Sequence, residues 1–355
     1  MSFLHRFFGP RHPRLPNVDA FRAIVERERD RADRLQCPFT LVAFDISQVE
    51  PEEVFIEGFV KVLQRRLRST DDFGLLTPHR VGIVLPHTGA GGAWKVSQDV
   101  CEMMHVSPQE LKCEIFEYPD TPPDDDHRQG QRGNDEATAE LAPRVTTKPM
   151  MELLCRGLPL TKRAIDILIS ATGLALLSPL FLVVGVAVRT SSPGPAFFKQ
   201  RRTGLGGKVF EMYKFRSMVV DAEAKQSELR NQSEQDGPAF KMKNDPRVTA
   251  IGKFLRSTSV DELPQLINLL FGDMTLVGPR PLPCHEAESC LPWQQRRLEV
   301  TPGITCIWQV EGRSRVSFAD WMRMDRRYVK TGSLVRDCWL LLATVPAVVL
   351  RRGAS

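Results

Sequence analysis

A chain of 355 residues is long for one compact unit, which favours two domains or one domain with large appendages. Its composition, 42% hydrophobic and 26% charged, is that of a folded protein and excludes a fully disordered one. The net charge of +5 is small for this length and says little by itself. No nucleic-acid partner is expected.

The eight cysteines form no Cys-x-x-Cys pair and no Cys/His cluster at metal-ligand spacing. They predict reduced, mostly buried thiols and favour the cytoplasmic side of a membrane over a secreted setting. Residues 1–16 contain no apolar core of signal-peptide length, so no export is expected.

The first region along the chain, residues 1–119, is predicted to be a small α/β domain. Helical patterns occur at residues 18–35, 54–67 and 93–104, and apolar strand patterns at 39–45 and 81–85. This alternation indicates a sheet covered by helices.

The same region resembles the diguanylate-cyclase (GGDEF-type) family in the strand at 41–46 and in the run 71–86. In that family a Gly-Gly-Asp-Glu-Phe turn before the second strand binds nucleotide phosphate. The corresponding residues here, Thr77-Pro78-His79-Arg80-Val81, lack the glycines and the acidic pair. Asp45 matches a family metal ligand but alone is interpreted as a strand-end acid. We therefore interpret the domain as catalytically inactive and regulatory, binding a protein or a regulatory ligand.

Residues 120–149 are polar and rich in Pro, Gly and Asp. Such a segment cannot bury enough apolar surface to offset the entropy of ordering, so it is predicted to be a flexible linker to a second domain at residues 150–355.

An apolar block follows at residues 164–188, and at about 1.5 Å per residue it is long enough to cross a bilayer core of about 30 Å. Asp166 lies at its start, Ser178-Pro179 in its middle, and basic residues on both flanks. A proline predicts a kink, and the serine hydroxyl is expected to bond the carbonyl that the proline frees. Basic flanks on both sides favour a helix that returns to the leaflet it entered. A kinked helix that crosses the bilayer stays open on spacing alone.

Residues 189–218 carry seven Lys or Arg and a single acid, which suggests contact with anionic lipid headgroups or a phosphorylated substrate. A solvated charged face is the alternative. The apolar run 338–350 is too short to span a membrane and is predicted to be an interfacial or core helix.

The adjacent acids Asp261 and Glu262 are the candidate catalytic residues. One of two such acids can attack phosphorus while the other binds metal or handles a proton, and Mg²⁺ prefers oxygen ligands of this kind. Arg256 precedes them by five residues, close enough for its guanidinium to reach the same phosphate. An isolated acidic pair is more often only a favourable helix start, and the neighbouring motifs change that interpretation.

From Lys162 to about Leu350 the chain resembles the bacterial sugar transferase family, the monotopic polyprenyl-phosphate phosphoglycosyl transferases. The motifs that carry the resemblance are Lys162-Arg163-x-x-Asp166, Ser178-Pro179, Tyr213-Lys214-Phe215-Arg216-Ser217-Met218, Arg256-Ser257-Thr258-Ser259-Val260-Asp261-Glu262-Leu263-Pro264-Gln265, Gly278-Pro279-Arg280-Pro281, Pro302-Gly303-Ile304-Thr305 and Trp308-Gln309-Val310-x-Gly312-Arg313.

The resemblance implies an α+β transferase domain on the cytoplasmic face of the bacterial inner membrane, with Ser178-Pro179 breaking a re-entrant helix at 164–188. It implies that Asp261 attacks a nucleoside-diphosphate sugar, a UDP-sugar by expectation, to form a covalent phosphosugar intermediate. Polyprenyl phosphate then accepts the sugar phosphate. Glu262 assists the second step or joins Asp261 in binding Mg²⁺.

Phosphate-binding roles are implied for Arg256 and Arg280, and for Lys214 and Arg313 as weaker candidates. One departure from the family pattern is Cys306, which stands where a glycine is usual and is expected to be harmless if its φ is negative. Two other functions stay open: a membrane-docked scaffold with an inactive transferase domain, and a nucleotide-signalling enzyme driven by residues 1–119. The sequence does not reveal the sugar, the glycan pathway or the oligomeric state.

Overall fold

The structure of the chain is a computed structural model that describes residues 15–49, 52–119, 147–242, 244–311 and 316–349. The chain divides into two compact units, Met1–Leu153 and Leu154–Ser355, and each is described by itself. Most of the predicted linker, residues 120–146, lies outside the described residues, while its last three residues form a short strand.

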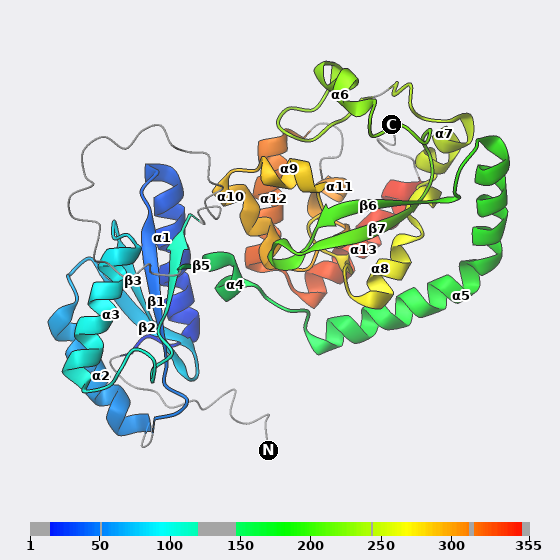
Figure 1. Ribbon diagram of the computed structural model, residues 1–355. Coiled ribbons are helices and arrows are strands. Elements are labelled where there is room, and N and C mark those ends of the chain that lie inside the picture. The colour runs from blue at the N-terminus through cyan, green and yellow to red at the C-terminus, as the bar shows by residue number, and fades with distance from the viewer. Residues whose placement is uncertain (1–14, 50–51, 120–146, 243, 312–315, 350–355) are drawn as a thin grey trace. The chain divides into compact units, whose positions relative to one another are not determined.

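The first unit is a five-stranded sheet with helices (Figure 1). Its elements are α1 (Val18–Leu35), β1 (Phe39–Asp45), α2 (Glu52–Arg66), β2 (Asp72–Thr77), β3 (Arg80–Pro86), α3 (Ala90–Met104), β4 (Glu114–Tyr118), β5 (Thr147–Pro149) and α4 (Met150–Leu154), the last reaching into the second unit. The strand order is β2-β3-β1-β4-β5, and every pairing is antiparallel except that of β4 with β5. The helices and strands predicted for residues 18–104 are confirmed within three residues at their ends.

A pair of glycines lets α1 approach this sheet closely. Gly74 in β2 pairs directly with Gly82 in β3. A Cβ on either glycine would lie 2.6 Å or less from an atom of the buried Phe21 ring. The two glycines therefore form the depression that receives Phe21 and seats α1.

The second unit mixes short helices with two small sheets. Its elements are α5 (Leu160–Ser191), β6 (Phe197–Thr203), η1 (Leu205–Gly207), β7 (Val209–Phe215), α6 (Gln226–Leu229), η2 (Arg230–Gln232), α7 (Ala250–Ser257), η3 (Val260–Glu262), α8 (Gln265–Phe271), β8 (Thr275–Val277), α9 (Cys284–Glu288), α10 (Pro292–Gln295), η4 (Arg296–Glu299), β9 (Gly303–Thr305), α11 (Ile307–Glu311), α12 (Phe318–Thr331) and α13 (Leu334–Val349). β6 and β7 form an antiparallel hairpin, and β8 and β9 a parallel pair. This confirms the expected mixture of helix and sheet.

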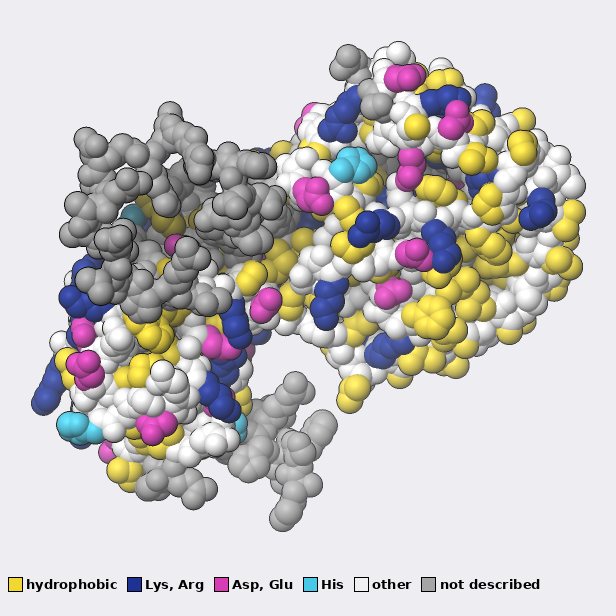
Figure 2. Space-filling view, in the orientation of Figure 1, with side chains coloured by type: hydrophobic (Ala, Val, Ile, Leu, Met, Phe, Trp, Pro, Cys, Tyr) yellow, Lys and Arg dark blue, Asp and Glu magenta, His cyan; other side chains and the backbone are white. Residues whose placement is uncertain are grey.

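The apolar block predicted at 164–188 lies inside the longer helix α5. Its mean hydropathy reaches 2.3, and only 11% of its most apolar stretch is buried in the protein. Leu168, Leu176 and Leu182 are each at least 68% exposed. Figure 2 shows hydrophobic side chains gathered on this side of the unit. A long exposed apolar helix of this kind, in the part of the chain that the structure describes, is consistent with association with a membrane.

The predicted break at Ser178-Pro179 lies within an uninterrupted helix. Figure 1 shows α5 changing direction part-way along its length, and Pro179 is its internal proline, the residue that most often bends a helix. The Ser178 hydroxyl donates a hydrogen bond of 2.9 Å to the carbonyl oxygen of Ala175, which is the carbonyl left without the N–H of Pro179. The predicted role of the serine is confirmed.

The first turns of α5 are fixed to the rest of the unit by three charged residues. The Lys162 ammonium bonds the carbonyl oxygen of Val277 at 2.7 Å and the Asp337 carboxylate at 2.9 Å. The Arg163 guanidinium donates to the last carbonyl groups of α8. Asp166 is fully buried and accepts the N–H of Leu276 at 3.1 Å. The motif Lys162-Arg163-x-x-Asp166 thus joins α5 to α8, β8 and α13.

The cysteine prediction is partly wrong. All eight thiols are free, as expected for a reduced protein. Only Cys101, Cys290 and Cys306 are buried, whereas Cys338 is exposed, because its side chain lies on the outer side of α13. Cys306 is not among the described residues with positive φ, so its place in the glycine position causes no backbone strain.

Candidate active site

The acidic pair lies in the short connection between α7 and α8. The Thr249 hydroxyl caps α7 by accepting the N–H of Gly252 at 3.0 Å, and α7 ends at Ser257. Ser259 then adopts a left-handed conformation with φ 56°, which reverses the chain and starts η3. η3 contains Asp261 and Glu262, and Pro264 begins the next helix. The acids are therefore held between two packed helices.

The neighbouring segment Lys214–Ser217 supplies a different contact from each residue. The Lys214 ammonium bonds Glu262, and Phe215 is buried against the ring of Phe181. The buried Arg216 guanidinium bonds carbonyl groups at the end of α5. The Ser217 hydroxyl accepts a hydrogen bond of 3.0 Å from Arg256 Nε. One short motif therefore joins the membrane helix to the acidic pair.

Glycine at position 252 makes this arrangement possible. A Cβ there would lie 1.9 Å from the carbonyl oxygen of Ser217, closer than any real contact. Because Ser217 bonds Arg256, the close approach of α7 brings the arginine near the acids.

Glu262 is bound by two cations. Lys214 Nζ lies 3.1 Å from Glu262 Oε1, and the Arg280 guanidinium donates to both carboxylate oxygens. Although burial opposes ionisation, these two cations hold the pKa of Glu262 far below its usual range. Glu262 in turn raises the pKa of Arg280, while burial lowers that of Lys214. The two cations thus favour the ionised form of Glu262, which does not suit a residue that carries protons at neutral pH.

Asp261 has a different environment. The residue is 7% exposed, and no residue that the structure describes donates a hydrogen bond to its carboxylate. Burial raises the pKa of Asp261, the charge of Glu262 raises it further, and Lys214, Arg256 and Arg280 oppose this effect. Two adjacent carboxyl groups with their pKa values moved apart have the environments expected of groups with different roles.

Arg280 reaches the pair from the turn after β8. Gly278 and Gly303 lie in close contact here, since a Cβ on Gly303 would be 2.0 Å from the nitrogen of Gly278. The turn is held by Arg297, which donates to the carbonyl oxygen of Arg280 and to Asp325 at 2.7 Å. Both Arg297 and Asp325 are almost fully buried, so the Arg280 backbone is firmly placed.

The structure brings together five of the predicted site residues: Asp261, Glu262, Arg256, Arg280 and Lys214. Ser178 and Pro179 lie in α5, and Arg313 lies outside the described residues. Sequence reasoning missed Arg202, Arg297 and Asp325. The basic composition of residues 189–218 was the available signal for Arg202, whereas nothing in the sequence singles out the other two.

The predicted Mg²⁺ ligands differ in their suitability. The Asp261 carboxylate has no hydrogen-bond donor among the described residues and fits a magnesium ion that also takes phosphate oxygens and water. Glu262 fits less well because both of its oxygens already accept from cations. Within the part of the chain that the structure describes, no group of three or more His, Cys, Asp or Glu is arranged to hold a metal.

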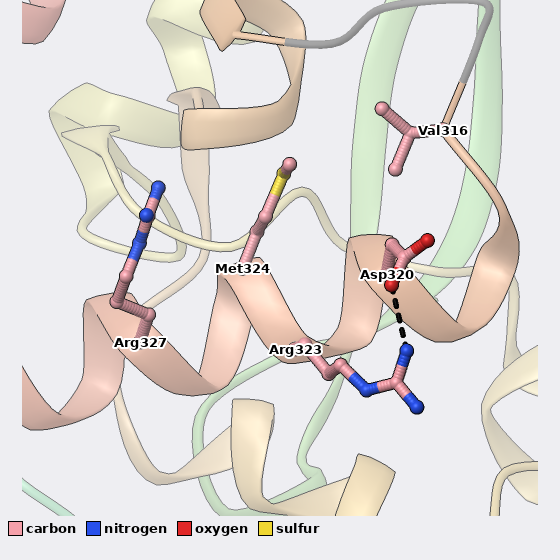
Figure 3. A pocket seen from close by; sticks show the side chains of 5 residues that line it. All are labelled: Val316, Asp320, Arg323, Met324 and Arg327. Carbon is pink, nitrogen blue, oxygen red and sulfur yellow. Dashed lines mark hydrogen bonds and ion pairs between the residues drawn. The ribbon is translucent and has the colours of Figure 1, made fainter.

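Two cavities of the second unit lie away from this pair. One, of about 360 Å³, is lined by Val316, Asp320, Arg323, Met324 and Arg327 along an outer face of α12 (Figure 3). Figure 3 shows Arg323 directed at Asp320, and the two lie 2.6 Å apart. The other, of about 260 Å³, lies around the start of α5 and includes Lys162, Tyr328 and Asp337. None of the predicted site residues that the structure describes lines either cavity.

A buried acidic pair surrounded by cations, in a unit with an exposed apolar helix, defines a membrane-associated protein with a centre suited to phosphate groups. The model of the family described as "Bacterial sugar transferase" matches residues 158–351, more than half of the chain. The chain belongs to this family, and the resemblance of residues from Lys162 to Leu350 is confirmed.

The chain is also similar to several curated proteins over more than half of its length. It is 43% identical over 200 residues to "Undecaprenyl-phosphate galactose phosphotransferase" of Salmonella typhimurium, covering 54% of this chain and 41% of the relative. It is 38% identical over 220 residues to "UDP-glucose:undecaprenyl-phosphate glucose-1-phosphate transferase" of Caulobacter vibrioides, covering 59% of this chain and 78% of the relative. It is 39% identical over 199 residues to "Exopolysaccharide production protein ExoY" of Sinorhizobium fredii, covering 55% of this chain and 88% of the relative. The match spans less than half of the Salmonella protein.

Among solved structures, the chain is similar to a DGC protein from Thermotoga maritima, with 16% identity, a TM-score of 0.26, and coverage of 30% of this chain and 84% of that one. It is also similar to the GGDEF domain of DgcB from Caulobacter crescentus, with 13% identity, a TM-score of 0.25, and coverage of 29% and 72%. Similarity at this level assigns neither a fold family nor a role to residues 1–119, so their cyclase-like character stays a prediction.

Proposed function

We propose that the protein transfers a sugar phosphate from a nucleoside-diphosphate sugar, most simply a UDP-sugar, to polyprenyl phosphate through a phosphosugar covalently bound to Asp261. The observation that carries the proposal is the contrast between the two acids. Glu262 is fully engaged by Lys214 and Arg280, while Asp261 keeps an unbonded carboxylate beside the same cations. The names of the curated relatives support the choice of donor and acceptor.

In the first step an Asp261 oxygen attacks the phosphorus that bears the sugar. The bond from this phosphorus to the bridging oxygen breaks, and the nucleoside monophosphate leaves with the electron pair. Attack by one anion on another is opposed by repulsion, so the cationic side chains of Lys214, Arg256 and Arg280 are needed to attract the diphosphate. The aspartyl phosphosugar that forms is a mixed anhydride and reacts readily.

In the second step a phosphate oxygen of the polyprenyl phosphate attacks the same phosphorus. The bond to the Asp261 oxygen breaks, which gives polyprenyl-diphosphate sugar and regenerates the carboxylate. Glu262 stays ionised throughout and holds Lys214 and Arg280 in position for both steps. When bound at Asp261 and the phosphates, Mg²⁺ would supply charge neutralisation.

We infer that α5 re-enters the leaflet from which it came and that the unit lies on the cytoplasmic face. Arg163 and Arg189 place positive charge at both ends of the helix, which supports a return to one side. A helix that returns keeps the acids at the membrane surface, where a water-soluble donor and a lipid acceptor both have access.

The first unit is proposed to be regulatory. β2 and β3 are joined by the tight turn Pro78-His79, and no glycine in it gives a phosphate close access to the backbone. Calorimetric titration of the full chain with cyclic dinucleotides and nucleoside triphosphates tests this role, and turnover of either ligand by the chain would contradict an inactive unit.

The function is tested by mixing the purified protein with a panel of UDP-sugars in the absence of lipid. The expected result is release of UMP up to one equivalent and a mass increase equal to one phosphosugar, with transfer after undecaprenyl phosphate is added. Asp261→Asn should abolish all three signals, while Asp320→Asn on the exposed face of α12 should change none. Absence of release and transfer with every sugar would overturn the proposal.

A further inference from the structure

A third arginine, Arg202, belongs with Arg256 and Arg280 to the cationic group near the acids. It lies near the end of β6, opposite Phe210 of β7, while Lys214 lies opposite Phe198. Residues an even number of positions apart face the same side of a hairpin, so Arg202 and Lys214 lie on one face. At about 3.3 Å per residue, the four positions from Phe198 to Arg202 separate the two by roughly 13 Å.

The guanidinium of Arg202 is held by neutral partners. Nε and Nη2 donate to Gln200 Oε1 at 3.0 and 2.5 Å, and Nη1 donates to the carbonyl oxygen of Pro281 at 2.8 Å. These bonds use three of its five N–H groups and leave one on each terminal nitrogen. No carboxylate of the described residues forms an ion pair with it. The group is therefore fixed in orientation and keeps two donors without an anion.

Its surroundings place this guanidinium next to the catalytic centre. Burial lowers the pKa of Arg202 to about 10, so it stays protonated at neutral pH, and the charges that act on it are the cations Arg280 and Arg297 and the anions Glu286 and Glu262. Arg280 contacts Glu262, which contacts Lys214. Arg202 bonds the carbonyl oxygen of Pro281, the residue after Arg280, so the charged side chains follow one another in the order Lys214, Glu262, Arg280 and Arg202. The buried Glu286 offsets part of the charge of Arg202 without forming an ion pair with it.

We propose that Arg202 binds the phosphate that leaves with the nucleoside, and so fixes the direction in which the donor lies in the site. This inference rests on the proposed function and extends it to a residue that has no assigned role. The two phosphates of a donor are linked through one oxygen, so a donor whose sugar-bearing phosphorus meets Asp261 can present its other phosphate toward Arg202. A planar guanidinium with one free N–H on each terminal nitrogen suits bidentate binding of that group.

The position also has a consequence for the first step. When the bridging bond breaks, negative charge accumulates on the nucleoside monophosphate, and a fixed cation at this point stabilises the departing group. The reaction needs no further reactant, because the electron pair of the broken bond remains on the leaving phosphate.

The test compares binding of UMP and of uridine to the full chain, by calorimetry for UMP and by competition for uridine. Arg202→Gln is expected to weaken the binding of UMP by about 10- to 100-fold, which is the effect of losing a charged hydrogen bond. The affinity for uridine should be unchanged. Arg202→Lys should retain part of the affinity. Arg201→Gln is the matched control, because Arg201 is exposed on the opposite face of β6.

If Arg202→Gln weakens the binding of UMP and of uridine equally, the proposal is overturned, because Arg202 would then only support the turn at Pro281. Unchanged UMP affinity in both variants, or no UMP binding by the wild-type chain, would overturn it as well. If Arg202→Gln fails to fold, as judged by its melting temperature, Arg202→Lys carries the test. A wild-type chain that binds UMP but neither releases it from UDP-sugars nor transfers sugar phosphate would contradict the proposed function instead.

Discussion

The ionisation of Asp261 gives the sharpest test of the site, because two substitutions should move it in opposite directions. As the proposed nucleophile Asp261 must be deprotonated, so the rate of UMP release in the first turnover should rise as the pH increases through its raised pKa. Lys214→Met removes a positive charge that favours the ionised carboxylate, so the rising limb of the pH–rate profile should move to higher pH. Glu262→Gln removes a negative charge that opposes it, and the limb should move to lower pH.

The size of the shift follows from the ion pair in the site. Lys214 Nζ lies 3.1 Å from Glu262 Oε1, where two unit charges attract by about 5 kcal/mol at an effective dielectric constant of about 20. For charges about twice as far apart the same law gives about 2 to 3 kcal/mol, or about 2 pKa units, and we take this value as the upper bound for the effect of Lys214 on Asp261. Partial exposure of Lys214 reduces the expected shift to about one unit.

The assay measures UMP release in a single turnover, without lipid, across the pH range in which the protein stays folded. Lys199→Met is the matched control, because Lys199 is an exposed lysine on the other face of β6 and should leave the profile unchanged. If both variants shift the limb in the same direction, or neither shifts it while Asp261→Asn abolishes release, the electrostatic account of this pair is refuted.

Three further predictions concern stability and topology. Asp325→Ala should lower the free energy of unfolding by about 3 to 5 kcal/mol, because it leaves the buried Arg297 unpaired. The control Arg323→Ala, on the exposed face of α12, should change it by less than about 1 kcal/mol. Denaturant titration measures both values. Gly252→Ala, whose Cβ would lie 1.9 Å from the Ser217 carbonyl oxygen, should lower the melting temperature and slow UMP release, and unchanged values for both would contradict the close packing. Pro179→Ala should straighten α5 and make residues after it accessible to a thiol reagent from the opposite side of the membrane, and an unchanged labelling pattern would contradict the role of the proline.

Much of the fold could be predicted where a local pattern controls it. The helix and strand at residues 18–45 were predicted with the observed bounds, because their periodicity is strong and a left-handed cap at Gln36 separates them. β2 and β4 were missed because they are only five or six residues long and gain their stability from pairing with β3 and β1. The sheet is mostly antiparallel, which the alternation of helix and strand does not reveal.

The candidate site was predictable only in part, for a similar reason. Asp261, Glu262 and Arg256 are close in sequence, so they could be recognised together. Arg202 comes into the group through the pairing of β6 with β7, and Arg297 with Asp325 through contacts between distant helices. Such side chains have no local signal, because burial and charge pairing depend on segments that meet only after folding.

The helix α8 has a consequence for how the enzyme senses its membrane. Its seven residues, roughly 10 Å long, have the acids immediately before their start and the guanidinium of Arg163, from the first turns of α5, at their end. The carboxylate of Asp261, the proposed nucleophile, is thus connected to α5 by a short helix and not by a flexible loop. With α5 in one leaflet, as proposed, the depth of this helix sets the height of Asp261 above the lipid headgroups, and we expect bilayer thickness to set how far a lipid phosphate must rise to react. Lipid composition would then act on the second step and leave UMP release unaffected.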